Sequence, residues 1–190
     1  MGSPKHCFEP ELWYGPSGSS ALLLEYESRC LKVSQDTYHS PNEVPEAHWR
    51  TLTADANLRL ESPLPPDVLE DYLRIKKLWK SRRDQTSPDL INSMPVSERQ
   101  ASLNYQQNLE AKRTRTFFST HGGRVGLGPC DLQTGDVICV LYGGAPLFML
   151  RFNGSSEVAQ LVGDAFVYGL MDLKSLPASD RGKDEWFTIG

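Results

Sequence analysis

The chain of 190 residues is 39% hydrophobic and 23% charged, which is typical of one globular domain or of one domain with an ordered extension. Its formal net charge is −4, whereas proteins that follow a nucleic-acid backbone usually carry a large basic excess. A general nucleic-acid-binding role is therefore disfavoured.

The sequence contains four cysteines, at positions Cys7, Cys30, Cys130 and Cys139. They are scattered along the chain, and no secretory signal precedes them. The strongest apolar run near the N-terminus, 21–24, is far too short to span a bilayer. We therefore expect free thiols, a cytoplasmic location and no membrane partner.

Residues 1–66 predict an irregular N-terminal arm, because their beginning is rich in Gly, Pro and Ser. Two short apolar runs within it, 21–26 and 30–33, are separated by polar residues. They indicate a β-hairpin that would contribute to a C-terminal sheet or barrel. A helix through 22–31 is the alternative, because Leu and Glu are good helix formers.

A long, proline-containing connection is expected over 40–66, with one or two helical turns between 46 and 60. Connections of this length are uncommon inside compact domains. We therefore expect the segment either to pack on the core through Trp49, Leu52 and Leu58 or to be a family-variable insertion.

The segment 67–115 predicts two helices. The first begins at Asp67 and has apolar side chains at spacings of three and four, which predict an amphipathic helix. Acidic residues lie in its first turn and basic residues towards its end, an order that complements the helix dipole. After a loop over 85–95, we expect a second helix from Ser97, as its N-cap, to Thr114. Its weak apolar stripe predicts a position on the surface of another element.

From Thr116 the pattern changes to short apolar runs separated by glycine, proline and Asn-Gly. These runs predict about six short strands, at 116–120, 124–127, 136–141, 147–152, 158–162 and 165–168, with 186–189 as a further piece. The expected hairpin turns are 121–123, 143–146 and 153–154. The last is the strongest signal, because Asn and Gly both tolerate the positive φ of a tight turn.

Strands of this length and spacing favour a small antiparallel β-barrel that is closed or nearly closed, since closure leaves no exposed edge. The predicted fold class is therefore α+β. It would comprise an irregular N-terminal part (1–66), a two-helix segment (67–115) and a β-barrel (116–190).

Three blocks in the C-terminal half carry long, ordered motifs. Block one, 115–129, reads R-T-F-F-S-T-H-G-G-R-V-G-L-G-P. Block two, 135–151, begins G-D-V-I-C-V-L and ends L-F-M-L-R, and block three, 161–172, reads L-V-G-D-A-F-V-Y-G-L-M-D. In this order and spacing, the segment 113–172 resembles the C-terminal β-barrel region of fungal heterokaryon-incompatibility (HET) proteins.

The resemblance implies a role in allorecognition and in regulated cell death after the fusion of unlike fungal cells. In that family the defining HET domain precedes this region and is usually held responsible for inducing death. No trace of that domain is found in these 190 residues. The resemblance therefore implies a non-catalytic recognition or regulatory module whose partner is another protein.

Gly126, Gly128 and Pro129 have two interpretations. They could cradle a phosphate, but a dinucleotide fingerprint needs a third glycine and a following helix, and Asp131 and a predicted strand stand there instead. We favour a tight turn between two strands.

Cys139 and His121 could form a nucleophile and its base. Cys139 lies in an apolar run, however, and no third group that would orient the base is evident, so we favour a small buried hydrophobic residue. Cys130 and His121 have no paired ligand spacing that would indicate a metal site.

Asp136 could be an acid or a base, but it follows Gly135 and more simply caps the turn before a strand. Asp164 and Asp172 are likewise interpreted as turn carboxylates.

The basic stretch 76–83, which includes Trp79, could bind nucleic acid or a membrane. We favour a solvated helix end, which suits the dipole of the first helix.

The sequence thus predicts no catalytic residue, no cofactor and no metal site. The main hypothesis is an interaction module. One alternative is a small-ligand-binding or enzymatic barrel with Arg124, Arg151 and Tyr168 at its mouth, and another is a structural remnant with no activity of its own.

Overall fold

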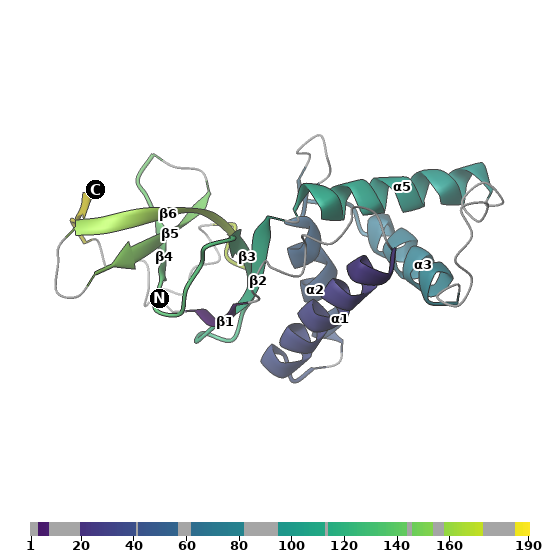
Figure 1. The fold of residues 1–190 in the computed structure, drawn as a ribbon, viewed down its shortest axis with the longest axis horizontal. Helices are drawn as coiled ribbons and strands as arrows, with labels where there is room; N and C mark the ends of the chain where they lie inside the picture. The colour runs from purple at the N-terminus through teal and green to yellow at the C-terminus, as the bar shows by residue number, and fades with distance from the viewer. Residues whose placement is uncertain are drawn as a thin grey trace.

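The computed structural model describes residues 4–7, 20–40, 42–56, 62–81, 95–112, 114–143, 146–153, 158–172 and 185–190. Figure 1 shows the helices gathered at one end of the molecule and the strands at the other. We call these two parts the helical lobe and the strand lobe. No helix among the described residues is long and apolar enough to cross a membrane.

Helix α1 runs from Ser20–Thr37, so the predicted hairpin over 21–33 is wrong and the helical alternative is confirmed. Its buried residues Glu27, Cys30 and Ser34 are spaced three and four apart, as on one face of a helix. The solvent side carries pairs of opposite charge one turn apart, such as Arg29 with Glu25 at 2.8 Å. The polar residues that resembled a turn in the sequence therefore belong to a continuous helix.

Helix α2 spans Glu43–Thr53, which is longer than the one or two turns expected and begins earlier. Trp49 and Leu52 are each 1% exposed, so the prediction that they pack on the core is confirmed, whereas Leu58 lies outside the described residues. The helix ends at Ala54, which adopts the left-handed conformation with φ of 52°.

The two predicted helices of the segment 67–115 are confirmed as α3 (Asp67–Ser81) and α5 (Val96–Ala111). The N-cap of α5 is Pro95 rather than Ser97, and no side chain caps this end. The expected loop over 85–95 lies almost entirely outside the described residues. Helix α5 packs on α3 through the rings of Tyr105 and Tyr72, whose centroids are 5.1 Å apart.

The strands form one seven-stranded sheet in the order β1-β2-β3-β6-β5-β4, with β7 paired in parallel to β6. Their bounds are β1 (Pro4–Cys7), β2 (Arg115–Thr120), β3 (Val125–Pro129), β4 (Val137–Val140), β5 (Leu147–Phe152), β6 (Val158–Val167) and β7 (Thr188–Ile189). All predicted runs are found, but 158–162 and 165–167 belong to the single long strand β6, and Tyr168 lies in the turn that follows it. The expected turns at 143–146 and 153–154 lie partly outside the described residues. Strand β1 was not predicted, because its residues lie in the Gly- and Pro-rich arm.

The α+β class is confirmed, but the described sheet is not closed into the expected barrel. Its pairings end at β1 on one side and at β4 on the other. Strand β6 holds the sheet together, because Ala159 to Ala165 pair with β5, whereas Phe166 and Val167 pair with β3. The pairing register shifts between Met149 and Leu150, as in a β-bulge, which bends a strand locally.

Two adjacent phenylalanines on β2 connect the lobes. Successive side chains of a strand point to opposite faces, so Phe117 and Phe118 enter different cores. Phe117 packs with the helices and with Val125, Leu127 and Phe166. Phe118 packs with the inner residues of β4, β5 and β6. Both rings are 0% exposed.

Gly126 is required by the ring of Phe118. A Cβ atom at this position would lie 2.4 Å from Cζ of Phe118 and 2.7 Å from the carbonyl oxygen of Phe166. We expect Gly126→Ala to lower the free energy of unfolding by about 1–3 kcal/mol, because the core would be overpacked.

Urea unfolding measures this change, with Gly122→Ala as the matched control. A Cβ atom added at Gly122 would meet only the Thr120 hydroxyl, at 3.7 Å, so this substitution should cost little. Equal costs at the two glycines would contradict the assigned contact.

Candidate functional site

The glycines considered for phosphate binding lie inside a strand. Gly126 and Gly128 pair with Phe118 and Thr116 of β2, and Pro129 ends β3. The predicted tight turn is therefore wrong at these positions, and a turn follows Pro129 instead. Both glycines face the ring of Phe118, so their small size serves packing.

Asp136 caps a turn, as predicted, and also forms a buried ion pair. Its Oδ2 atom accepts a hydrogen bond from the amide of Gln133 at 2.8 Å. Arg151, on β5, donates from Nε to Oδ1 and from Nη2 to Oδ2, each at 2.8 Å, and from Nη2 to the carbonyl of Asp131 at 2.7 Å. Arg151 is therefore a structural partner of Asp136, which is 1% exposed.

We expect Arg151→Ala to lower the free energy of unfolding by about 3–5 kcal/mol, because it leaves a buried carboxylate without its charge partner. Arg29→Ala is the control, since it breaks an exposed ion pair with Glu25 and should cost less than about 1 kcal/mol. Urea unfolding compares both variants with the wild type. If both variants lost a similar small amount of unfolding free energy, the expected cost of leaving Asp136 without its partner would be contradicted.

Cys139 and His121 are not brought together as a nucleophile and base. His121 lies in the exposed turn after β2, whereas Cys139 lies on β4, and β3, β6 and β5 separate these strands in the sheet. The Cys139 thiol donates to the carbonyl of Phe148 at 3.5 Å, and burial raises its pKa to about 11. The interpretation as a small buried residue is confirmed. Cys130 is an exposed free thiol, and the described residues contain no cluster that could hold a metal ion.

Asp164 and Lys76 both differ from their sequence interpretations, and each forms an ion pair with a residue of another element. Asp164 lies within β6 rather than in a turn, and its Oδ2 atom is 3.1 Å from Nη2 of Arg115. Lys76, in the basic stretch, differs from the predicted solvated helix end, because its ammonium lies 2.6 Å from the buried carboxylate of Glu27, whereas Lys77 is exposed as predicted. Arg82 and Arg83 lie outside the described residues.

Glu27 is the centre of a buried polar cluster between three helices. Its side chain is 2% exposed, and it accepts hydrogen bonds from Lys76 and from the hydroxyl of Tyr72, both on α3. His48, on α2, places Nε2 3.8 Å from the Glu27 carboxylate. Its Nδ1 atom lies 3.4 Å from the hydroxyl of Ser34. Ser, His and Glu are residue types found in hydrolases, but these three are sealed from solvent, so a substrate could not reach them.

The protonation states of the cluster follow from burial and pairing. Burial raises the pKa of Glu27, but the neighbouring His48, Lys76 and Tyr72 side chains lower it more, so the net shift is downward. Burial lowers the pKa of His48, whose imidazole is therefore neutral. No sequence pattern indicated this cluster, because its members come from separate helices and Glu27 resembled a turn residue.

These shifts predict that the protein is destabilised by acid. The unfolded chain takes up a proton at His48 near pH 6.5, whereas the folded chain does so only at lower pH, so stability falls as the pH drops below about 6.5. The slope of the free energy of unfolding from this one group approaches about 1.4 kcal/mol per pH unit. The lowered pKa of Glu27 adds a further loss below its ordinary value of 4.5.

Urea unfolding between pH 5 and 8 tests this prediction by comparing the wild type with His48→Gln. We expect the substitution to flatten the profile between about pH 5 and 6.5. A steep slope that persists in His48→Gln would contradict the assignment.

A hollow of about 490 Å³ lies where the helical lobe meets the end of β6. One wall consists of 63–66 together with Arg50 and Asp55, and the other of Phe166, Tyr168, Gly169, Met171 and Asp172. The second wall belongs to block three of the sequence motifs. Tyr168, which was predicted at a barrel mouth, is therefore a lining residue of this hollow. Arg124 instead donates to the carbonyl of Gly169 at 3.4 Å, and Arg151 belongs to the Asp136 pair.

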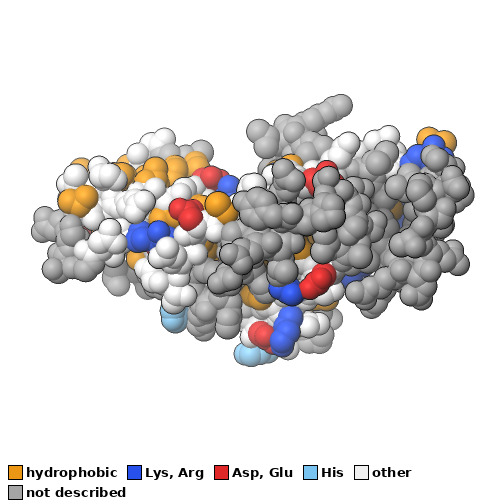
Figure 2. Space-filling view, in the orientation of Figure 1, with side chains coloured by type: hydrophobic (Ala, Val, Ile, Leu, Met, Phe, Trp, Pro, Cys, Tyr) orange, Lys and Arg blue, Asp and Glu red, His pale blue; other side chains and the backbone are white. Residues whose placement is uncertain are grey.

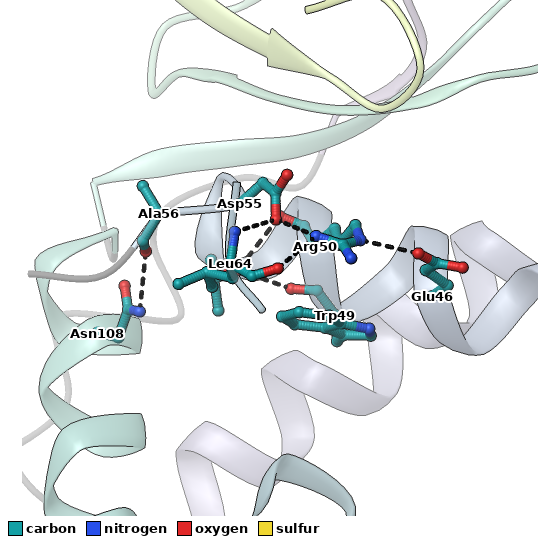
Figure 3. A network of polar contacts seen from close by, with 8 residues as sticks. Glu46, Trp49, Arg50, Asp55, Ala56, Leu64 and Asn108 are labelled. Carbon is teal, nitrogen blue, oxygen red and sulfur yellow. Dashed lines mark hydrogen bonds and ion pairs between the residues drawn. The ribbon is translucent and has the colours of Figure 1, made fainter. Parts of the chain in front are cut away.

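The wall from the helical lobe is fixed by a polar network, which Figure 3 shows. Arg50 donates to the carboxylates of Glu46 and Asp55 and to the carbonyl of Leu64. Asp55 also accepts a hydrogen bond from the amide of Leu64 at 3.1 Å. From α5, the amide of Asn108 donates to the carbonyl of Ala56 at 3.1 Å. Asp55, Ala56 and Leu64 are thereby held against α2 and α5.

The opposite wall is positioned by contacts between the lobes. The amide of Tyr168 donates to the carbonyl of Val125 at 3.0 Å, and the amide of Val125 donates to the hydroxyl of Tyr38 at 3.4 Å. The rings of Tyr38 and Tyr168 meet edge to face at 6.4 Å. Gly169 turns the chain with φ of 76°, so Met171 and Asp172 return to the hollow. Both walls are thus preformed, as is usual for binding sites.

Comparison with known proteins gives one family match. The model of the Het-6 beta-barrel domain matches residues 66–189. This range includes the segment 113–172, so the resemblance seen in the sequence is confirmed. No curated protein and no solved structure matches the chain.

Proposed function

The chain belongs to the Het-6 beta-barrel domain family, and we propose that it is a non-catalytic recognition module that contributes to allorecognition and regulated cell death. Its partner in this proposal is another protein, and its place of action is the cytoplasm. The observation that carries the proposal is the position of block three. This motif block, part of the family resemblance, lines a preformed hollow at the junction of the two lobes.

The arrangement of reactive groups supports a binding role over a catalytic one. Among the described residues, the Ser34, His48 and Glu27 side chains are sealed between helices, and the Cys139 thiol is bonded to a backbone carbonyl. The arginine of the hollow is engaged by two carboxylates and a carbonyl. These groups stabilise the fold, and the hollow offers shape and charge rather than an activated nucleophile.

The surface of the strand lobe also supports protein recognition. Figure 2 shows hydrophobic side chains along the part of this lobe where β6 runs. Partly exposed apolar residues of β5, β6 and β7 are Phe152, Val158, Leu161 and Ile189. Apolar groups of this kind at a surface are typical of protein interfaces.

The proposal is tested in fungal cells that express the chain and fuse with an incompatible strain. We expect the double variant Tyr168→Ala and Met171→Ala to weaken the cell-death response, because it removes two lining side chains of the hollow. Immunoblotting and thermal unfolding establish that the variant is present and folded. The control is Tyr142→Ala, which changes an exposed tyrosine outside the hollow. A full response from the folded double variant would refute the proposed role of the hollow.

A further inference from the structure

We propose that the hollow receives a lysine or arginine side chain from an extended segment of the partner protein. This inference rests on the proposed recognition role and names the chemistry of the partner. It follows from the size of the hollow, from its apolar and aromatic walls, and from the acidic balance of the charged groups around it.

The hollow is large enough to admit a long amino-acid side chain, and its lining suits one. The volume of about 490 Å³ lies in the lower part of the range of roughly 300–1,000 Å³ that is usual for binding pockets. Pro63, Pro65 and Pro66 form one apolar side, and Phe166 and Met171 form the other. Such walls can contact the aliphatic stem of a long basic side chain.

The charges favour a cation over an anion. Among the described residues that line the hollow, Arg50 is the only lysine or arginine, and it already donates to Glu46, Asp55 and the carbonyl of Leu64. One guanidinium between two carboxylates leaves this group with a net charge of minus one. Asp172 adds a second carboxylate to the lining beside that of Asp55. An incoming carboxylate or phosphate would therefore meet like charge, whereas an ammonium or guanidinium would meet opposite charge.

Tyr168 provides the aromatic surface that a basic head group prefers. Its ring is held by the edge contact with Tyr38, and its backbone is bonded to Val125. A cation over a tyrosine face is attracted by the ring quadrupole, and a nearby carboxylate adds to this attraction. A purely apolar side chain would cover the carboxylates without compensating for their loss of water. The apolar walls, the Tyr168 ring and the two carboxylates together therefore favour a basic side chain.

The test is an NMR titration of the full chain with capped tripeptides. The probes are Ala-Arg-Ala, Ala-Lys-Ala, Ala-Leu-Ala and Ala-Glu-Ala, each acetylated and amidated. We expect the arginine and lysine peptides to shift the resonances of Tyr168 and Met171, and the leucine and glutamate peptides to leave them unchanged. Binding of the leucine or glutamate peptide with equal affinity, or no binding of either basic peptide, would overturn the inference.

Two variants locate the binding. Asp172→Asn should lower the affinity for the arginine peptide by about two- to fivefold, and Tyr168→Leu should lower it by about tenfold. The matched control Asp131→Asn changes an exposed aspartate on another loop and should have no effect. Because Asp172 is exposed, its variant should fold even if Tyr168→Leu does not. Unchanged affinity in Asp172→Asn would also overturn the inference.

The two proposals fail in different ways. If the hollow variants lose the cell-death response but the wild-type chain binds no basic peptide, the recognition role stands and the partner chemistry is wrong. If the basic peptides bind in the hollow but the folded hollow variants keep a full response, the chemistry stands and the recognition role of the hollow is wrong.

Discussion

The structure depends on the placement of Phe117 and Phe118 on opposite faces of β2. One ring completes the core of the helical lobe, and the other fills the core of the strand lobe. Neither lobe can therefore repack without moving the strand that serves both, since protein cores have little free volume. Gly126, beneath the second ring, is one consequence of this constraint. The hollow is another, because its two walls come from the lobes that β2 and β3 connect.

Local signals in the sequence predicted much of the fold. The strands were predicted because glycines and Asn-Gly punctuate short apolar runs, and the helix from Asp67 because its apolar residues follow a helical spacing. The errors arose where distant contacts decide the structure. In the sequence, Glu27 resembles a turn residue, because its partners Lys76 and Tyr72 lie on another helix. Strand β1 exists because β2 offers it a pairing edge, which no property of Pro4 to Cys7 reveals. The hollow joins residues more than a hundred positions apart, so no short pattern could predict it.

The charged residues of the described chain act mainly on one another. The pairs of Glu27 with Lys76 and of Asp136 with Arg151 each connect elements that are separate in the sequence. Breaking a buried pair by removing one partner is costly, whereas the net gain of the intact pair is small. These pairs therefore specify how the elements are arranged more than they add to stability. Groups that looked like site chemistry in the sequence, such as Asp136 and Arg151, are explained in this way.

The helical core also has a consequence for how the protein can be dissected. The family match begins at residue 66, yet Cys30, Trp49, Leu52 and Leu64 precede it and pack in the same cluster as Phe117, Leu127 and Phe166. Strand β1, which pairs with β2, also precedes the matched range. A fragment cut at residue 66 would expose the apolar side of β2 and β3 and free one edge of the sheet, both of which promote aggregation. In this chain, the span 66–189 that matches the family model is thus shorter than the span that packs together.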